Sequence, residues 1–303
     1  MARGARSAQL KMTRVSNTVE LSDIVRDAHD RRTRLRITGR GTWPARAGSV
    51  AADAAELELS ALTGIVEYVP GDLTLTAKAG TTIAEIDAAT LANGQWCPLL
   101  PWGGDDGTLG ATFATATHGP CSTTLGAPRD HAIGLEFVDG TGAVIRAGGR
   151  VVKNVAGFDL TRLLVGSWGS LGAITEVSVR LRARPAVDET WIVRVEDGAA
   201  VSRLDTLRRG PLAPLAVEAL DGRTLVRIGG NAAFVAASRE ALKSIGEIHS
   251  ADPASWIRLR VSDPHPRAPL ASNAVADPLA QRVKKQFDPA HILNPGIMGE
   301  QYA

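Results

Sequence analysis

The spacing of hydrophobic residues predicts a mixture of helices and strands over the first half of the chain. Apolar residues recur at helical intervals in residues 18–33. Three strand-like runs follow, at residues 35–41, 56–70 and 73–80. A second helix is expected over residues 81–94, with Thr81 as its N-cap and Gly94 at its end. Residues 131–149 predict a β-hairpin, because two alternating runs flank an Asp-Gly-Thr-Gly turn.

The pattern changes after the Arg-Pro pair that ends at residue 185. Residues 186–275 alternate strand-like and helix-like runs, which predicts an α+β insert with its own sheet. The proline-rich stretch 262–269 is interpreted as the linker back, and the chain ends in a helix and an Asn-Pro-Gly turn. We therefore expect an α+β protein with three parts, at residues 12–185, 186–275 and 276–303.

Composition and charge limit the partners of the chain. Its 303 residues are 44% hydrophobic, enough for a sizeable core, and its net charge of +2 is too small to indicate nucleic-acid binding. The pair Lys284 and Lys285 is interpreted as part of a solvated face. Two cysteines, Cys97 and Cys121, are too few to hold an iron–sulfur cluster within the chain, and no disulfide framework is expected.

No segment of the sequence indicates export or membrane insertion. The basic N-terminal residues lack the apolar core of a signal peptide, and no apolar run reaches the length of a membrane span. We expect a cytoplasmic protein without a transmembrane segment, with attachment to the inner membrane face through partners as an alternative. Its own partner should be a small molecule or another protein.

Two glycine-rich segments suit a bound phosphate or a flat ligand. In residues 37–44, a strand leads into two glycines whose backbone N–H groups suit a diphosphate, although a simple surface turn is the alternative. Pro44 stands where a dinucleotide-binding Gly-x-Gly-x-x-Gly sequence has its last glycine, and no helix pattern follows, so we exclude an NAD site of that type. Residues 100–120 combine small residues with threonine hydroxyls. Such residues would pack poorly as a core and would make an unusually long loop, but they suit a binding surface for a flat, elongated ligand.

A third segment, residues 166–177, places glycines at every third position before a strand, where backbone can lie against a ligand. Together with the C-terminus, these segments resemble the FAD-binding fold of the vanillyl-alcohol oxidase/PCMH superfamily. The resemblance covers nearly the whole chain and rests on four motifs in order: TGRGT, GTLGATFATATHGP, GSWGSLGAITEVSVRL and FDPAHILNPGIM. Residues 148–177 are most similar to the FAD-binding small (E-type) subunit of bacterial glycolate oxidase. The implied architecture is a two-lobed PCMH-type FAD-binding domain with a short α+β cap domain.

The resemblance also implies which residues bind FAD. The diphosphate would be wrapped by Thr38, Gly39, Arg40, Gly41, Thr42 and Trp43. The flavin and its ribityl chain would be lined by Pro101, Trp102, Gly107, Thr108, Gly110, Ala114, Thr115, Ala116, Thr117 and His118. Ile174 would offer backbone groups to the adenine end, and Asn294 would approach the flavin. Many relatives carry a histidine in the first loop that bonds covalently to the flavin. Thr42 or Trp43 takes its place here, so the resemblance implies non-covalent FAD.

The catalytic residues are less well defined by the sequence. A flavin dehydrogenase removes a hydride from a hydroxyl-bearing carbon while a base takes the hydroxyl proton, and a 2-hydroxy acid also needs a cation for its carboxylate. Lys153, Asn154 and Arg258 are candidates for substrate binding, and His118 is a candidate base. The alternative for Lys153 and Asn154 is capping of the following turn, and for His118 a structural role in a tight turn. Asp159 is expected to cap the helix after it.

The resemblance implies an FAD-dependent oxidoreductase subunit that oxidises glycolate or another small 2-hydroxy acid. Its implied partners are a larger FAD subunit and an iron–sulfur subunit. Two alternatives stay open: a flavin-holding structural subunit without turnover of its own, and a stand-alone aldonolactone- or alditol-type carbohydrate oxidase, which THGP at 117–120 favours. No metal site is expected, because His249 and His265 are isolated in the cap region where catalytic relatives place metal-binding histidines.

Overall fold

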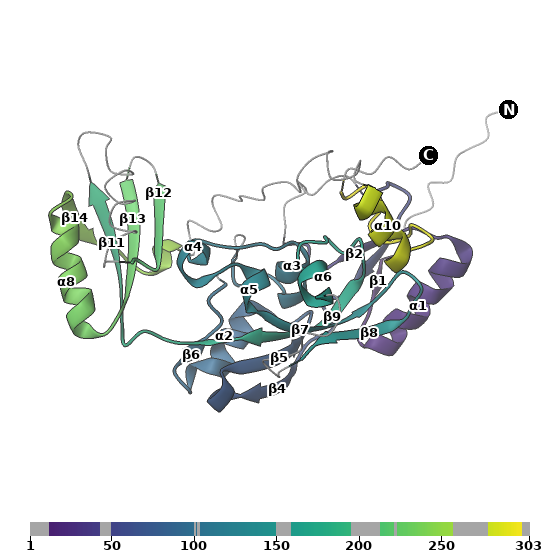
Figure 1. The fold of residues 1–303 in the computed structure, drawn as a ribbon, viewed down its shortest axis with the longest axis horizontal. Helices are drawn as coiled ribbons and strands as arrows, with labels where there is room; N and C mark the ends of the chain where they lie inside the picture. Colours follow the sequence, from purple (N-terminus) through teal and green to yellow (C-terminus); the bar gives the residue numbers. More distant parts are fainter. Residues whose placement is uncertain are drawn as a thin grey trace.

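The computed structural model describes residues 12–42, 50–99, 101, 104–149, 159–194, 213–220, 223–256 and 278–298. These residues form two adjoining lobes and a separate small sheet, which lies at the opposite end of the molecule from helices α1 and α10 (Figure 1). Along the sequence, the elements of the two lobes come first and those of the small sheet follow. The chain then returns to the lobes through α10 (Pro278–Phe287).

The first lobe is a small parallel sheet with one helix packed on it. Its strands, in the order β1-β3-β2, are β1 (Thr13–Arg14), β3 (Ala55–Glu58) and β2 (Leu35–Thr38). Helix α1 (Thr18–Arg31) begins after Asn17, whose side chain accepts a hydrogen bond from Glu20 N. Leu21, Val25 and Ala28 lie one turn apart and are buried, so this stripe forms the contact with the core.

The second lobe is a five-stranded antiparallel sheet. Its strands, in spatial order, are β4 (Ile65–Val69), β5 (Thr74–Lys78), β9 (Ala173–Arg180), β7 (Ala132–Val138) and β8 (Val144–Gly148). Three helices of this lobe are α2 (Ile83–Leu91), α3 (Leu109–Ala114) and α6 (Leu160–Leu164). Leu109 and Phe113 of α3 are fully buried, and they join Phe137 of β7 in the core of this lobe. Short elements complete it: η1 (Pro70–Asp72), α4 (Ser122–Leu125), α5 (Pro128–His131) and the pair β6 (Gln95–Trp96) with β10 (Arg182–Ala183).

The small sheet, here called the cap sheet, is antiparallel and has its own core. Its strands, in spatial order, are β12 (Ala216–Leu220), β13 (Arg223–Gly230), β11 (Val187–Arg194) and β14 (Glu247–Ser250). Helix α8 (Ala232–Lys243) packs against it. A cluster that includes Trp96, Cys121 and Trp256 connects the cap sheet to the second lobe.

The structure confirms several expectations and corrects three. The α+β class, the hairpin of β7 and β8, and the capping of α6 by Asp159 are confirmed. The N-cap of α2 is Thr82, not Thr81, because the Thr82 hydroxyl and the Glu85 carboxylate bond each other's backbone N–H as a capping box. The expectation that residues 100–120 would make a poor core is wrong for α3, since Leu109 and Phe113 of this helix are fully buried. Lys284 is buried rather than solvated, whereas Lys285 is exposed.

Within the described ranges, no helix combines the length and the apolar character that a bilayer crossing requires. The cap sheet lies inside residues 186–275, but the limits of the three parts stay predictions from the sequence.

Candidate cofactor site

A cavity of about 560 Å³ is lined by both lobes and by the C-terminal segment. The first lobe contributes residues 36–42, in β2 and after it, and the second lobe contributes α3 and residues 168, 169 and 172–174. Asn294 and Ile297 contribute from the C-terminal segment. A volume of this size is typical of small-molecule and cofactor sites, which often lie between structural units.

Most of the FAD-binding residues expected from the sequence and described by the structure line this cavity. They are Thr38, Gly39, Arg40, Gly41, Thr42, Thr108, Gly110, Ala114, Thr115, Ile174 and Asn294. The fold therefore brings together three glycine-rich segments that are far apart in the sequence.

Other expected residues lie elsewhere or outside the described part of the chain. Trp43, Trp102, Lys153, Asn154 and Arg258 fall outside the described residues. Five more are described but are not among the lining residues: Pro101, Gly107, Ala116, Thr117 and His118. His118 is exposed, and its Nδ1 lies 3.3 Å from Ala116 O, so this geometry gives no support to its candidate role as base.

The small size of Gly110 serves packing inside the protein. A Cβ at this position would lie 2.5 Å from the Ala79 Cβ, and Gly110 N donates to Ala79 O at 2.8 Å. Gly110 therefore lets α3 rest directly on the chain after β5. The sequence interpretation, in which such glycines admit the ligand, is incomplete here, because the contact that excludes a side chain is with Ala79.

The turn at residues 167–170 forms one wall of the cavity. Trp168 lines it with a left-handed backbone (φ 54°), and its N–H donates to Ala114 O at the end of α3 at 2.7 Å. Gly169 is also left-handed (φ +69°), and a Cβ there would lie 2.7 Å from Asn294 Nδ2. Position 169 therefore needs glycine both for its left-handed backbone and for the close approach of the Asn294 side chain.

The Asn294 side chain spans the two lobes. Its Oδ1 accepts from Ile37 N of β2 at 2.6 Å, and its Nδ2 donates to Trp168 O of the second lobe at 2.8 Å. Asn294 is buried, with 5% of its surface exposed, and it adopts a left-handed backbone (φ 43°). The sequence predicted that this residue lies at the site; the structure adds that its amide group connects the walls.

The charged groups of the cavity come mainly from the first lobe. Arg36 and Arg40 line it together with Glu56, and Arg36 faces Glu56 in the register of β2 and β3. Two guanidinium groups near a loop of backbone N–H groups suit a diphosphate. Sequence reasoning missed Arg36, although it lies two residues before Thr38 in the same strand, and alternate strand residues share a face.

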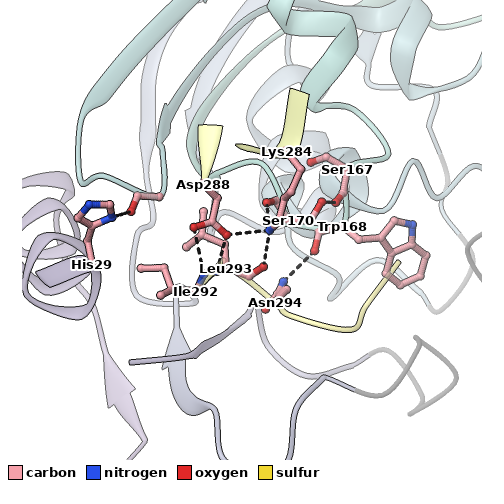
Figure 2. Close-up of polar contacts among 10 residues, drawn as sticks. His29, Ser167, Trp168, Ser170, Lys284, Asp288, Ile292, Leu293 and Asn294 are labelled. Atoms are coloured by element: carbon pink, nitrogen blue, oxygen red, sulfur yellow. Dashed lines mark hydrogen bonds and ion pairs between the residues drawn. The ribbon is translucent and has the colours of Figure 1, made fainter. Parts of the chain in front are cut away.

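A second omission is a buried ion pair behind the turn at 167–170. Figure 2 shows Lys284 and Asp288 in contact with each other and with backbone groups of this turn and of Leu293. A signal was available, because Val283 and Phe287 form the apolar stripe of α10 and their neighbours Lys284 and Asp288 share that side at helical spacing. Among the described residues, no group of three or more His, Cys, Asp or Glu side chains is arranged to hold a metal ion.

Comparisons with known proteins agree with this geometry. Residues 11–148 match the family described as "FAD binding domain". The chain is 35% identical to glycolate oxidase subunit GlcE of Escherichia coli (strain K12) over 61% of this chain and 53% of that protein. It is 32% identical to glycolate oxidase subunit GlcD of Bacillus subtilis (strain 168) over 70% of this chain and 45% of that protein. The chain thus spans about half the length of these curated relatives.

A solved structure of an alkyldihydroxyacetonephosphate synthase shares the fold. The TM-score is 0.70 over 84% of this chain and 56% of that chain, at 17% sequence identity. At this identity the likeness concerns the architecture alone.

Proposed function

We propose, from the match of residues 11–148 to the FAD binding domain family, that the chain contains a PCMH-type FAD-binding domain and that FAD binds non-covalently in the cavity between the lobes. We further propose that the protein is a subunit of a glycolate oxidase-like complex that oxidises a small 2-hydroxy acid. The observation that carries the proposal is the 560 Å³ cavity, whose walls are the glycine-rich segments of both lobes. Its substrate class rests on the names of the relatives.

The lining residues fit an elongated dinucleotide with a diphosphate at its centre. Residues 38–42 offer backbone N–H groups and the Thr38 and Thr42 hydroxyls, and Arg36 and Arg40 offset the phosphate charge. Ile174 would present backbone to the adenine end. When bound, FAD supplies the redox chemistry by accepting the hydride from the hydroxyl-bearing carbon.

The chain's own contribution to the reaction would be to bind and orient the substrate. A cation that holds the carboxylate fixes the 2-carbon, and a base receives the hydroxyl proton. Lys153, Asn154 and Arg258 remain the proposed substrate residues. The two cysteines are fewer than the four that a cluster needs, so the electrons would leave through partners: a larger FAD subunit and an iron–sulfur subunit.

The proposal that FAD occupies the cavity is tested by a substitution that fills the cavity with a larger side chain. Ala111 lines the cavity on α3, and Ala111→Phe should block it; Ala236→Phe, on the exposed face of α8 in the cap region, introduces the same ring away from the cavity. FAD is added to each purified protein and binding is measured by flavin fluorescence and the visible spectrum. We expect wild type and Ala236→Phe to bind FAD and Ala111→Phe not to bind it. Equal binding by all three proteins would show that FAD lies elsewhere.

Two further measurements test the attachment and the substrate. Acid precipitation should release all flavin to the supernatant; flavin that stays with the protein would contradict the non-covalent assignment. Glycolate or D-lactate, added without oxygen, should bleach the flavin absorbance. Bound flavin that neither acid bleaches would favour the flavin-holding subunit, and bleaching by a sugar acid lactone or an alditol alone would favour the carbohydrate oxidase.

A further inference from the structure

The C-terminal segment is attached to both lobes beside the cavity. Asn294 N donates to Leu35 O at 2.9 Å and Leu35 N donates to Ile292 O at 2.7 Å, so the segment runs along β2 of the first lobe. Phe287 O accepts from Gly140 N, after β7 of the second lobe, at 2.7 Å. Residues 287–294 therefore connect the two lobes by backbone hydrogen bonds on either side.

Lys284 of α10 and Asp288, at the start of this segment, form a polar centre in which each donor and acceptor has a hydrogen-bond partner. Lys284 Nζ lies 2.7 Å from Asp288 Oδ2, with side-chain exposures of 8% and 0%. The ammonium also donates to Ser170 O at 2.6 Å and to Leu293 O at 3.1 Å, so each of its three protons has an acceptor. The Asp288 carboxylate accepts from Ile292 N at 3.0 Å and from Leu293 N at 2.9 Å.

This centre lies next to the cavity wall. Ser170 ends the turn whose Trp168 and Gly169 line the cavity, and Leu293 immediately precedes Asn294 (Figure 2). The ammonium of Lys284 thus binds both the wall turn, through Ser170 O, and the residue before Asn294, through Leu293 O. Any shift of either group would change the two hydrogen bonds by which Asn294 connects Ile37 to Trp168.

The net stability of the fold is a weak explanation for such a pair. Desolvation of two charges offsets most of their attraction, and replacement of a buried ion pair by apolar residues of similar volume is often neutral or stabilising. Directional bonds to two backbone carbonyls (Ser170 and Leu293) and two backbone N–H groups (Ile292 and Leu293) instead determine where those groups lie. We propose that Lys284 and Asp288 are positioning residues for FAD, which set the separation of Ile37 and Trp168 across the cavity. The inference rests on the proposed binding of FAD in this cavity.

The test compares three variants with wild type. The double variant Lys284→Met/Asp288→Leu removes both charges and keeps the volume, and Asp288→Asn keeps the shape and one acceptor oxygen. The matched control is Arg227→Met/Asp188→Leu, which removes an ion pair of the cap sheet with an N–O distance of 2.6 Å and side-chain exposures of 15% and 32%. Each full-length protein is assayed for urea unfolding without FAD, for the dissociation constant of FAD, and for the visible spectrum of the bound flavin.

A positioning role predicts that, in the double variant, FAD binding changes while the stability of the FAD-free protein does not. The FAD dissociation constant of Lys284→Met/Asp288→Leu should rise about tenfold, the change expected when one well-placed hydrogen bond is lost. Asp288→Asn leaves the buried Lys284 ammonium without its counter-charge, so it should lower the free energy of unfolding as well as the FAD affinity, and both spectra should shift relative to wild type. The control pair should bind FAD as wild type does.

Each other outcome overturns the proposal. Wild-type FAD affinity in either folded variant would show that the pair does not position the cavity walls. A double variant that fails to fold would show that the pair holds the fold together instead. A control variant with the same loss of affinity would assign the effect to general destabilisation. Failure of the proposed function is separate, because it would appear as FAD binding by Ala111→Phe or as no binding by wild type.

Discussion

Replacement of Gly169 by alanine adds one methyl group at the point where the C-terminal segment meets the cavity wall. The new Cβ would lie 2.7 Å from Asn294 Nδ2, and the backbone at this position has φ +69°. Gly94 is the matched control, since its φ is +60° and a Cβ there would meet nothing within 4 Å. Gly94→Ala therefore measures the conformational cost alone.

The expected loss of stability follows from these contacts. The left-handed conformation costs an alanine about 1–2 kcal/mol at either position. At position 169, the Asn294 amide must also move, and it would lose its bonds to Ile37 N and Trp168 O. Each such hydrogen bond contributes about 0.5–1.5 kcal/mol. Gly169→Ala should therefore lower the free energy of unfolding by about 2 kcal/mol more than Gly94→Ala does.

The assay is urea unfolding of the FAD-free proteins, followed by circular dichroism at constant temperature and analysed by linear extrapolation. Equal m-values in the three proteins would establish that the unfolding free energies are comparable. A difference between the two variants of less than about 0.5 kcal/mol would refute the reasoning, since this is the scatter expected for independent sites. It would mean that Asn294 accommodates the methyl group without loss of its bonds.

Three further predictions concern groups away from the cavity. Burial lowers the pKa of His131 below its ordinary value of 6.5. The neutral imidazole therefore stabilises the folded protein fully above pH 6.5, and this stabilisation is lost as the pH falls from 6.5 through the lowered pKa. Urea midpoints between pH 8 and 5 should thus fall more steeply for wild type than for His131→Gln, and parallel curves would contradict the assignment. Thr82→Ala removes half of the capping box with Glu85 and should cost about 1 kcal/mol in urea unfolding; no change would show that the box is not formed. Burial raises the pKa of the Cys97 thiol to about 12, so a thiol reagent at pH 8 should label Cys97 only after unfolding, and rapid labelling of the folded protein would contradict its burial.

The class of the fold was predictable because its main signals are local. The helical spacing of Leu21, Val25 and Ala28 and the alternation in β7 and β8 depend on residues that are close in sequence. The glycine-rich segments were also visible as candidates for a ligand site. Their order and separation led to the family resemblance, which the comparison with FAD-binding domains confirms.

Errors arose where a residue's environment comes from distant parts of the chain. Lys284 and Lys285 are adjacent and of the same type, and the local signal, that Lys284 shares the side of Val283 and Phe287 on α10, is too weak to establish burial. The burial of Lys284 depends on acceptors at Ser170 and Leu293. Gly110 is likewise explained by Ala79, which lies 31 positions earlier, directly after β5.

The sequence by itself determined the longer helices, most strands, the glycine-rich segments and the kind of cofactor, because short-range periodicity and motif order carry that information. Only the tertiary structure decided that Asn294 connects Ile37 to Trp168, and that Lys284 and Asp288 lie behind this connection. The physical reason is that a polar side chain becomes buried only when distant backbone groups replace the hydrogen bonds it had with water. Such partners are 126 and 257 positions from Asn294, beyond the reach of any local pattern.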